Sequence, residues 1–476
     1  MTNRGTAACS AKPRAVTALN LLVFLLVATS SFAAETKRRP NVVLFIADDL
    51  GWADCSIYKR DSGIRTPNME RLGRDGMTFT HAFVASPSCA PSRAALLTGL
   101  TPFRNGAMFN HMVPDAPLKK WPAYFAEAGY ETAAIGKVAH YATVRGYGFD
   151  HVSHFKYHED DCVTAAVDWL GNRKSDKPLC LIVGTNWPHV PWPKKTEYAP
   201  GSVPLTPTQV DTPETREWRA RYAQAVTDAD RDLGLIYDAA RKVLGEETLF
   251  LFSSDHGSQF PFGKWNCYDA GIRTPLIVAW PGKIAPGTHS DAMVSWLDIL
   301  PTCLEAIGTT PPTSGTAPGQ ISGRSFLPVL RGEKNEHRET MFATHSGDGR
   351  MNEYPMRAVR SRDWKYIRNL APETEHHTHV DKAQGEDGKG YWSSWEKKAE
   401  SDAAAASVLA RYFHRPAEEL YDLKSDPWEL KNLAAAAEHR ETLARLRAEV
   451  DGSMKAERDG GLSSENARRP AAARKP

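Results

Sequence analysis

The chain has 476 residues, about three times the usual size of one domain, so one large domain with a smaller partner, or two to three medium ones, is expected. Hydrophobic residues make up 41% and charged residues 24%, which is typical of a globular protein and excludes a disordered, collagen-like or multispanning one. The net charge is only +2, from 59 basic and 57 acidic side chains, which excludes the broad basic surface of a nucleic-acid-binding protein.

The first 34 residues have the pattern of a secretory signal peptide. Arg4, Lys12 and Arg14 precede an apolar run over residues 19–28, and small residues follow it up to Ala34. An uncleaved anchor is the alternative, but the apolar run is shorter than the roughly 20 residues that a membrane span needs. We therefore expect a periplasmic or secreted protein with no stable membrane anchor.

Alternating strand and helix patterns indicate the fold class. Residues 41–47 and 249–252 are continuous apolar runs, as in strands that are buried on both faces. Further strands are expected at 132–135, 179–183 and 276–280, and helices at 162–170, 215–244 and 294–307. This alternation predicts an α/β fold with a large, mostly parallel sheet sandwiched by helices.

The pattern changes near residue 335, where short strand-like pieces, a polar insertion and a final helix at 438–457 predict a smaller α+β unit. The last residues are rich in Arg, Ala, Gly and Pro, which is typical of a disordered tail. The expected organisation is a signal peptide at 1–34, a main α/β domain at 35–334, a C-terminal α+β subdomain at 335–457 and a disordered tail at 458–476.

Acidic residues follow two of the predicted strands. Asp48 and Asp49 end the first strand, and Asp255 and His256 follow a later one. Ligands gather at the carboxyl ends of such strands, where the turn at Lys137 should also lie. Adjacent carboxylates repel each other unless a cation offsets their charge, so the pattern indicates a hard divalent ion. Taken singly, a helix cap and an Asx-turn explain these acids equally well.

Cys89 lies in a proline-punctuated loop at the start of a helical run. A nucleophile at a helix N-terminus meets a favourable partial positive charge, which lowers the pKa of a thiol. An ordinary buried cysteine is the alternative.

Residues 89–99 carry Cys89, Pro91 and Arg93 in the order Cys-x-Pro-x-Arg, followed by Leu-Thr-Gly. This segment resembles the signature of the type I sulfatases, which belong to the alkaline phosphatase superfamily. The resemblance runs through most of the mature chain, including residues 136–140, 188–189 and 419–427. It implies a hydrolase whose catalytic domain is residues 35–334. It also implies that a separate maturation enzyme oxidises Cys89 to formylglycine, whose hydrated aldehyde is the nucleophile.

Carried over position by position, the resemblance gives each site residue a role. Many relatives have asparagine at the position of His256, and a subset has histidine. The implied calcium ligands are Asp48, Asp49, the modified Cys89, Asp255 and His256. The other implied roles are to hold the formylglycine diol (Arg93), to contact sulfate oxygens (Lys137 and Lys264) and to transfer protons (His140 and His189). Without the resemblance, solvated lysines and structural histidines explain the last four residues as well.

The chemistry of sulfate transfer fits these residue types. A sulfate monoester repels an incoming anion, so a metal ion and two ammonium groups are needed to neutralise the charge that develops. One diol hydroxyl attacks sulfur, and the departing alcohol or amine takes a proton from His189. Loss of the proton from the remaining hydroxyl, to His140, then expels sulfate and restores the aldehyde.

The implied substrate is a sulfated saccharide, and the bond cleaved is left open. Residues 254–268 and 354–359 resemble the heparan N-sulfatases (sulfamidases), which usually have arginine at the position of Lys264. Residues 136–140 and 188–191 resemble equally the iduronate 2-sulfatases, which act on O-sulfate. Both resemblances imply degradation of a glycosaminoglycan.

Three other functions remain open at this point. The first is a phosphoesterase of the same superfamily, which normally carries serine or threonine in place of Cys89 and binds a second metal. The second is a glycan-binding protein that has lost catalysis, and the retained acids and cations argue against it. The third is a papain-like thiol hydrolase, which would use unmodified Cys89 and would not need Asp48 or Asp49.

Overall fold

The main sheet is mostly parallel, as the sequence predicts. In the computed structural model, which describes residues 7–8, 39–155, 161–383 and 389–469, its strands follow the order β4-β3-β5-β1-β6-β7-β2-β8, with β9 beside β2. Strand β7 is antiparallel to both of its neighbours. The strands are β1 (Asn41–Ala47), β2 (Met77–Phe83), β3 (Glu131–Gly136), β4 (His151–Ser153), β5 (Leu179–Gly184), β6 (Thr248–Ser254), β7 (Arg273–Ala279), β8 (Thr288–Ser290) and β9 (Val294–Ser295).

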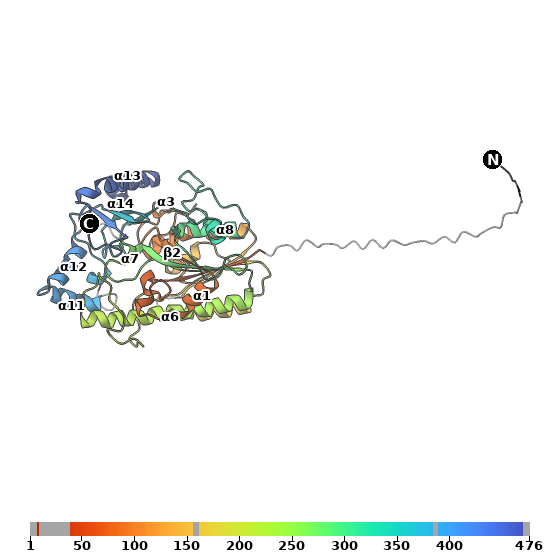
Figure 1. Ribbon diagram of the computed structural model, residues 1–476, viewed down its shortest axis with the longest axis horizontal. Helices are drawn as coiled ribbons and strands as arrows, with labels where there is room; N and C mark the ends of the chain where they lie inside the picture. The colour runs from red at the N-terminus through yellow and green to blue at the C-terminus, as the bar shows by residue number, and fades with distance from the viewer. Residues whose placement is uncertain (1–6, 9–38, 156–160, 384–388, 470–476) are drawn as a thin grey trace, which may run out of the picture. The chain divides into compact units, whose positions relative to one another are not determined.

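Helices cover both faces of this sheet (Figure 1). The α-helices of the chain up to residue 330 are α1 (Pro67–Asp75), α2 (Cys89–Thr98), α3 (Pro102–Asn105), α4 (Trp121–Glu127), α5 (Asp161–Asn172), α6 (Pro213–Leu244), α7 (Asp269–Ile272), α8 (Ile299–Ala306) and α9 (Leu327–Leu330). Short 3-10 helices are η1 (Trp52–Asp54), η2 (Arg60–Ser62), η3 (Tyr141–Gly146), η4 (Trp296–Asp298) and η5 (Ala437–His439).

Strand β1 shows why helices must cover both faces of the main sheet. Its alternate residues Val43 and Phe45 enter the hydrophobic core formed with α1, α5 and α6, while Val42 and Leu44 enter the core formed with α2, α4 and α8. Successive side chains of a strand point to opposite faces, so a strand that is apolar throughout must be covered on both. The continuous apolar run in the sequence is therefore the cause of the three-layer arrangement.

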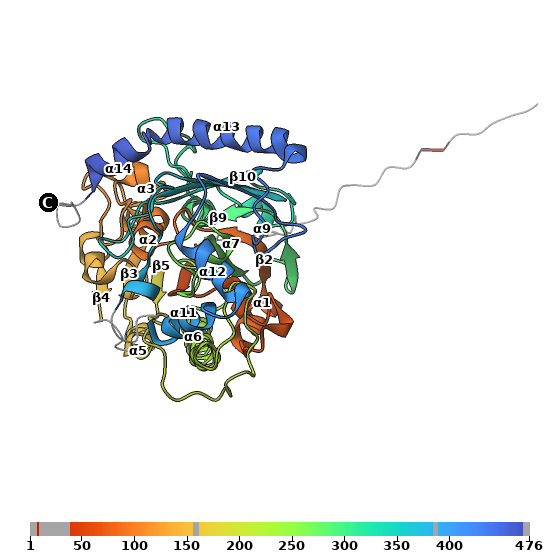
Figure 2. The ribbon, with the colours of Figure 1, turned by 90° about the vertical axis from the view of Figure 1, so that its left-hand side faces the viewer.

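A second, antiparallel sheet lies in the C-terminal part, as expected. It has the order β10 (Thr340–His345), β11 (Met356–Ser361), β12 (Trp364–Asn369) and β13 (Glu418–Asp422). Helix α13 (Arg440–Glu457) lies along this sheet, with Leu446 and Val450 in a small core between them (Figure 2). The other helices of this part are α10 (His379–Lys382), α11 (Lys389–Ala399), α12 (Ala403–Phe413) and α14 (Leu462–Arg468).

The structure differs from the sequence prediction at the end of the chain. Residues 458–476 were expected to be a disordered tail, but their described part, up to residue 469, contains helix α14. Two acids of this segment bind one buried arginine: Arg357 donates to Asp459 and, at 2.5 Å, to Glu465. A polar, charged segment is ordered here because its charges are paired inside the protein.

The helix predicted at 294–307 is shorter than expected. Residues 294–298 form β9 and η4, and α8 begins only at Ile299. Ser295 accepts a hydrogen bond from the backbone of Leu297, and Asp298 accepts one from the backbone of Ser295, which makes a capping box at the start of η4, the 3-10 turn that precedes α8. Within the described residues, no helix has both the length and the apolar character needed to cross a bilayer. The predicted signal peptide, residues 1–34, lies outside the described residues apart from 7–8.

Candidate active site

The predicted convergence of acids at the strand ends is present. Strands β1 and β6 are parallel neighbours in which Ala47 pairs with Ser254, so Asp48 and Asp255 follow side by side. The backbone N–H of Asp49 donates to Oδ1 of Asp255 at 3.1 Å. Asp49 has a φ of +66°, a left-handed conformation that few non-glycine residues adopt, and this turns the second acid into the same site.

Lys137 enters the site from the end of β3. Gly136 pairs with Gly184 of β5 and has a φ of +79°, and a Cβ at Gly136 would lie 2.1 Å from the carbonyl oxygen of Gly184. Only glycine allows the two strand ends to approach this closely. The buried Lys137 ammonium then forms an ion pair with Oδ2 of Asp48 and lies 3.9 Å from Sγ of Cys89.

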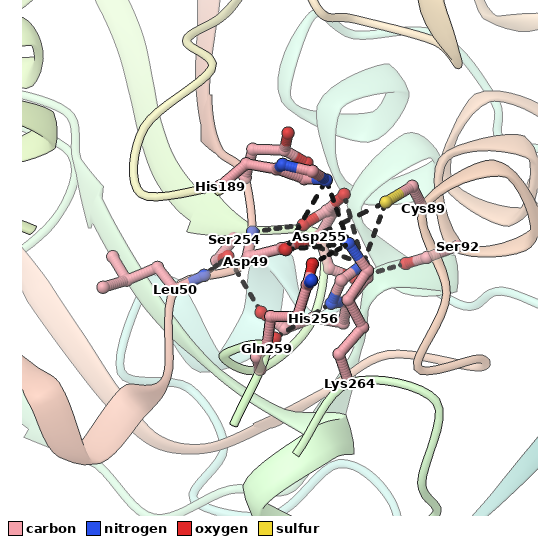
Figure 3. Close-up of polar contacts among 12 residues, drawn as sticks. Asp49, Leu50, Cys89, Ser92, His189, Ser254, Asp255, His256, Gln259 and Lys264 are labelled. Atoms are coloured by element: carbon pink, nitrogen blue, oxygen red, sulfur yellow. Dashed lines mark hydrogen bonds and ion pairs between the residues drawn. The ribbon is translucent and has the colours of Figure 1, made fainter. Parts of the chain in front are cut away.

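Cys89 is the first residue of α2 and is buried, and its sulfur points toward the acids and cations of the site (Figure 3). Its Sγ lies 3.3 Å from Nε2 of His256 and 4.0 Å from Oδ1 of Asp49. Burial raises the pKa of the thiol, but the positive charges of Lys137, Lys264 and His256 overcome it and lower the pKa below its usual value. The sequence prediction that this position favours an anionic nucleophile agrees with this electrostatic environment.

Arg93 lies one turn later on α2 and ties the strand ends together. Its Nε donates to Asp255 at 2.9 Å, one terminal nitrogen donates to Asp48 at 3.0 Å, and the other donates to the carbonyl of Lys137. Burial raises the pKa of Asp48, but Lys137 and Arg93 outweigh it and hold that pKa well below its usual value. Asp48 is therefore a carboxylate whose two oxygens both face cations.

Lys264 and His189 form the other side of the site. Lys264 Nζ donates to Oδ2 of Asp49 at 2.7 Å and lies 3.1 Å from Nε2 of His189, whose Nδ1 lies 2.7 Å from the carbonyl oxygen of Val190. Because a carbonyl only accepts, Nδ1 of His189 carries its proton and Nε2 faces the ammonium. Burial, and then the charge of Lys264, hold the pKa of His189 well below its usual value.

One group of side chains is arranged to hold a metal ion. Asp49, Cys89, Asp255 and His256 each offer a ligand atom, and these atoms lie within 4.8 Å of one another. Asp48 falls instead in a second such group, with Asp49 and His189.

The orientation of His256 supports metal binding by the first group. Its Nδ1 lies 3.0 Å from the carbonyl oxygen of Gly257, so Nε2 points at the other ligand atoms, which is the usual arrangement of a metal-binding imidazole. Burial raises the pKa of Asp49 to about 7, because Lys264 and His256 only partly offset it. A divalent cation would supply the charge that this carboxylate lacks, so the residues fit a metal.

His140 makes its side-chain hydrogen bond to a histidine that the sequence analysis did not single out. Its Nε2 lies 2.8 Å from Nδ1 of His111, and Nε2 of His111 lies 3.2 Å from Oδ1 of Asp348. Asp348 is buried and also accepts hydrogen bonds from Asn110 and, at 3.1 Å, from Nε1 of Trp265. Sequence reasoning missed His111 and Asp348, because single polar residues in loops carry no periodic signal.

Unusual backbone conformations also mark the site. Among the described residues, most non-glycine residues with a clearly positive φ are site residues or lie beside them in the chain: Asp49, His111, Tyr141, Phe262 and Trp265. Such conformations are retained where the surrounding structure fixes them, and they concentrate at functional sites.

Buried ammonium groups converge on Cys89 beside four side chains placed to hold a metal ion, an arrangement suited to an anionic ligand. The sequence model of the family described as "Sulfatase" matches residues 40–309, more than half of the chain, so the chain belongs to the sulfatase family. A second model, "N-sulphoglucosamine sulphohydrolase, C-terminal", matches residues 257–387. The resemblance of residues 89–99 to the sulfatase signature is thereby confirmed at the level of the family.

Two relatives align over most of their length. An ulvan-active sulfatase of Formosa agariphila is 28% identical, and the match covers 91% of this chain and 83% of the relative. The human N-sulphoglucosamine sulphohydrolase is 29% identical, with 87% of this chain and 90% of the relative covered.

Solved structures confirm the alkaline phosphatase-like sulfatase fold. A protein solved with its substrate, D-glucosamine-2-N,6-O-disulfate, is similar with a TM-score of 0.66 at 20% identity, covering 89% of this chain and 99% of that one. A phosphonate monoester hydrolase from Silicibacter pomeroyi has the same TM-score of 0.66 at 19% identity, covering 89% of this chain and 97% of that one. At these identities the likeness describes the fold.

Proposed function

We propose that this sulfatase-family hydrolase removes sulfate from a sulfated glycan, with the N-sulfate of glucosamine as the first candidate bond. The observation that carries the proposal is the convergence on Cys89: Nζ of Lys137 at 3.9 Å, Nε2 of His256 at 3.3 Å, and the charge of Lys264 acting on the same atom. The two ammonium groups, of Lys137 and Lys264, suit an anionic sulfate better than a neutral ester.

The nucleophile of the proposal is formylglycine, made from Cys89 by a maturation enzyme, and its hydrated aldehyde supplies a hydroxyl that attacks sulfur. Asp48, Asp49, the modified Cys89, Asp255 and His256 would hold a calcium ion; four of them form one group of ligand atoms, and Asp48 shares a second group with Asp49. Oxidation of Cys89 replaces a soft sulfur donor with the oxygen that calcium prefers. When bound, the ion supplies charge stabilisation for the anionic substrate.

The remaining side chains bind sulfate and move protons. Lys137 and Lys264 neutralise the charge on the sulfate oxygens. Arg93 holds the formylglycine diol, and its hydrogen bonds to Asp48 and Asp255 fix it in that position. His189 gives a proton to the departing alcohol or amine. Burial and the charge of Lys264 hold the pKa of this imidazole well below its usual value, so His189 is neutral before the reaction and acts as the acid once its Nε2 has taken up a proton. The ammonium of Lys264, 3.1 Å from that nitrogen, is placed to supply it.

His140 accepts the proton that must leave for the product sulfate to depart. It is buried, follows Lys137 closely in the chain, and is neutral because burial and the charge of Lys137 hold its pKa well below its usual value. A neutral imidazole has one nitrogen lone pair and can act as a base.

An O-sulfate ester is the second candidate, favoured by the ulvan-active relative that covers 91% of this chain. The human relative and the C-terminal family model instead favour the N-sulfate. Lysine at position 264, a point charge without the fork of an arginine, is compatible with either bond. We further propose a secreted or periplasmic protein with a catalytic domain at 35–334 and a subdomain at 335–457.

The test is a side-by-side measurement of kcat/KM on matured protein. The substrates are N-sulfoglucosamine, glucosamine 6-O-sulfate, a sulfated aryl ester and the matching aryl phosphate. We expect the highest kcat/KM on a sulfated sugar, with N-sulfoglucosamine first. Preferential turnover of the phosphate would replace the sulfatase proposal with a phosphoesterase, and tight saccharide binding without turnover would replace it with a glycan-binding protein.

A further inference from the structure

Asp348 and His111 form a chain of side chains with His140, the proposed base, and have no role in the mechanism so far. Oδ1 of Asp348 lies 3.2 Å from Nε2 of His111, and Nδ1 of His111 lies 2.8 Å from Nε2 of His140. Nδ1 of His140 is a buried atom with no hydrogen-bond partner among the described residues. A buried polar atom is rarely left unpaired, so this nitrogen needs an explanation.

The hydrogen-bond directions follow from what each group can do. A carboxylate only accepts, so Nε2 of His111 carries a proton and donates it to Asp348. When His111 is neutral, its Nδ1 is then a lone pair that accepts from Nε2–H of His140. A neutral His140 therefore has its own lone pair on Nδ1, the unpaired atom. The chain thus fixes His140 in the tautomer of a base whenever His111 is neutral. The hydrogen bond to Asp348 raises the pKa of His111, so this tautomer holds at pH values above that raised pKa.

Asp348 is itself held firmly in the required orientation. Its Oδ2 accepts hydrogen bonds from Nδ2 of Asn110 at 2.8 Å and from Nε1 of Trp265 at 3.1 Å, which leaves Oδ1 for His111. Burial raises the pKa of Asp348, but the hydrogen bond from His111 is the largest of the contacts that outweigh it, so the pKa lies below its usual value. Asn110 also accepts from the backbone N–H of Ala90, next to Cys89, so the chain is anchored to α2.

We propose that Asp348 and His111 are positioning residues that hold His140 as the base of the sulfatase reaction. This inference rests on the proposed function. When Nδ1 of His140 takes the proton of the remaining formylglycine hydroxyl, the aldehyde C=O forms and the C–O bond to the departing sulfate breaks. The imidazole becomes positively charged and keeps its Nε2–H bond to His111. Asp348 stays ionised and stabilises this charge through His111, and no proton passes along the chain. The arrangement compensates for burial and Lys137, which make His140 a weak base.

Asp348→Asn is the decisive variant, because it reverses the donors and acceptors in the hydrogen bonds that run from residue 348 to His140 and keeps those bonds in place. Asn110 and Trp265 both donate to Oδ2, so the new amide oxygen stays with them and its NH₂ group faces His111. His111 must then accept at Nε2 and donate at Nδ1, so His140 accepts at Nε2 and carries its proton at Nδ1. The base is lost while the shape of the side chain is conserved. We expect kcat to fall about 10²-fold or more, with KM within about twofold of the parent.

A matched pair at position 111 separates positioning from packing. His111→Gln keeps an oxygen that accepts from His140 and an N–H that donates to Asp348, so we expect it to retain most of kcat. His111→Leu keeps similar bulk and the same strained backbone but neither hydrogen bond, so we expect a loss of kcat like that of Asp348→Asn. The control is His337→Gln, in a second histidine–carboxylate pair 3.1 Å from Asp298, and its kcat should not change.

A second readout does not depend on turnover. Nitrogen NMR of histidine-labelled protein, at a pH where the same spectra show His111 to be neutral, reports which ring nitrogen of each histidine carries the proton. We expect Nε2–H for His140 in the parent and Nδ1–H in Asp348→Asn. An unchanged tautomer, an unchanged kcat, or a change confined to KM would overturn the proposal. Absence of sulfatase turnover in the parent would instead remove the proposed function, and the spectra would still test the chain.

Discussion

Two arginines in this protein have the same kinds of hydrogen-bond partner but lie in different regions of the fold. Arg93 and Arg357 are both fully buried, and each binds two carboxylates and a backbone carbonyl. Arg93 does so at the strand ends of the main sheet, whereas Arg357 ties β11 to the end of the chain. The ion pairs alone therefore do not distinguish a site from a structural clamp.

The difference lies in what else the carboxylates face. Around Arg93, Asp48 also binds Lys137, and the neighbouring Asp49 binds Lys264 and lies 4.0 Å from Sγ of Cys89. Around Arg357, Glu465 also accepts a hydrogen bond from Ser346, which is an ordinary structural contact. The cluster around Arg93 has additional cations that lie close to Cys89, which is typical of a reactive site. In the cluster around Arg357 the charges are paired with one another, which is typical of a structural ion pair.

The largest expected effect comes from the atom on which the first cluster converges. Cys89→Ala removes the precursor of the nucleophile, so we expect kcat to fall about 10⁴-fold or more while the fold persists. The control is Cys303→Ala, a buried cysteine in the core on one face of the sheet, which should alter stability and leave kcat unchanged. Turnover by Cys89→Ala near the parent level would show that the cluster around Arg93 is structural too.

Metal removal should affect the first cluster only. Chelation leaves Asp49 and Asp255 without the cation that offsets them, so we expect loss of activity and a lower Tm, both restored by Ca²⁺. Saturating ion at 100 times its Kd corresponds to about 2.7 kcal/mol of stabilisation. In Asp255→Asn the Tm should no longer respond to Ca²⁺. A parent enzyme that keeps full activity after exhaustive chelation would contradict the metal assignment.

Buried lysines offer a matched pair across the two kinds of cluster. Lys264→Met removes an ammonium that we assign to sulfate, so we expect a loss of about 10²–10³-fold in kcat. Lys365→Met removes an equally buried ammonium that pairs with Asp269 and Glu429, outside the site. That variant should lose stability and keep its kcat per folded molecule. Equal losses of kcat in both variants would mean that Lys264 acts through the fold.

The structural clamp should respond in stability. Arg357→Met leaves Asp459 and Glu465 buried without their cation, so we expect the free energy of unfolding to fall by about 3–5 kcal/mol. Urea denaturation measures this loss, and the kcat of the remaining folded protein should be unchanged. A stability equal to that of the parent would show that α14 is not held by this arginine.

The smallest effect is a pH dependence at Glu465. Burial raises the pKa of this carboxyl above its usual value despite the pull of Arg357. A carboxyl whose pKa is raised in the folded state stabilises the protein while it is protonated. This contribution is complete at pH values below the ordinary pKa near 4.5 and is lost as the pH rises through the raised pKa. The parent should therefore lose stability relative to Glu465→Gln as pH rises from 4 to 8. A difference that is flat, or that grows in the parent's favour, would contradict this sign.

Much of the fold could be predicted from the sequence because its signals are local. The apolar runs at 41–47 and 249–252 became β1 and β6, and the acids after them share one edge because parallel neighbours end together. Cys89 and Arg93 were found through a short motif with fixed spacing. These features depend on neighbours in the sequence or on one rule of sheet geometry.

The rest depends on contacts between distant segments. His111 and Asp348 lie far apart in the chain and meet only after folding, so neither carries a signal of its own. Residues 458–469 have the composition of a disordered tail, yet Arg357 holds them through Asp459 and Glu465. A polar segment is ordered when a distant partner compensates its charge, and composition does not record that partner.

The most direct test of the account is the mass of the peptide that contains residue 89, in protein made by a host with the maturation enzyme. We predict the mass of an aldehyde at this position, together with an aldehyde-reactive label that Cys89→Ala lacks. An intact thiol at residue 89 in protein that still hydrolyses sulfated saccharides would contradict the central claim.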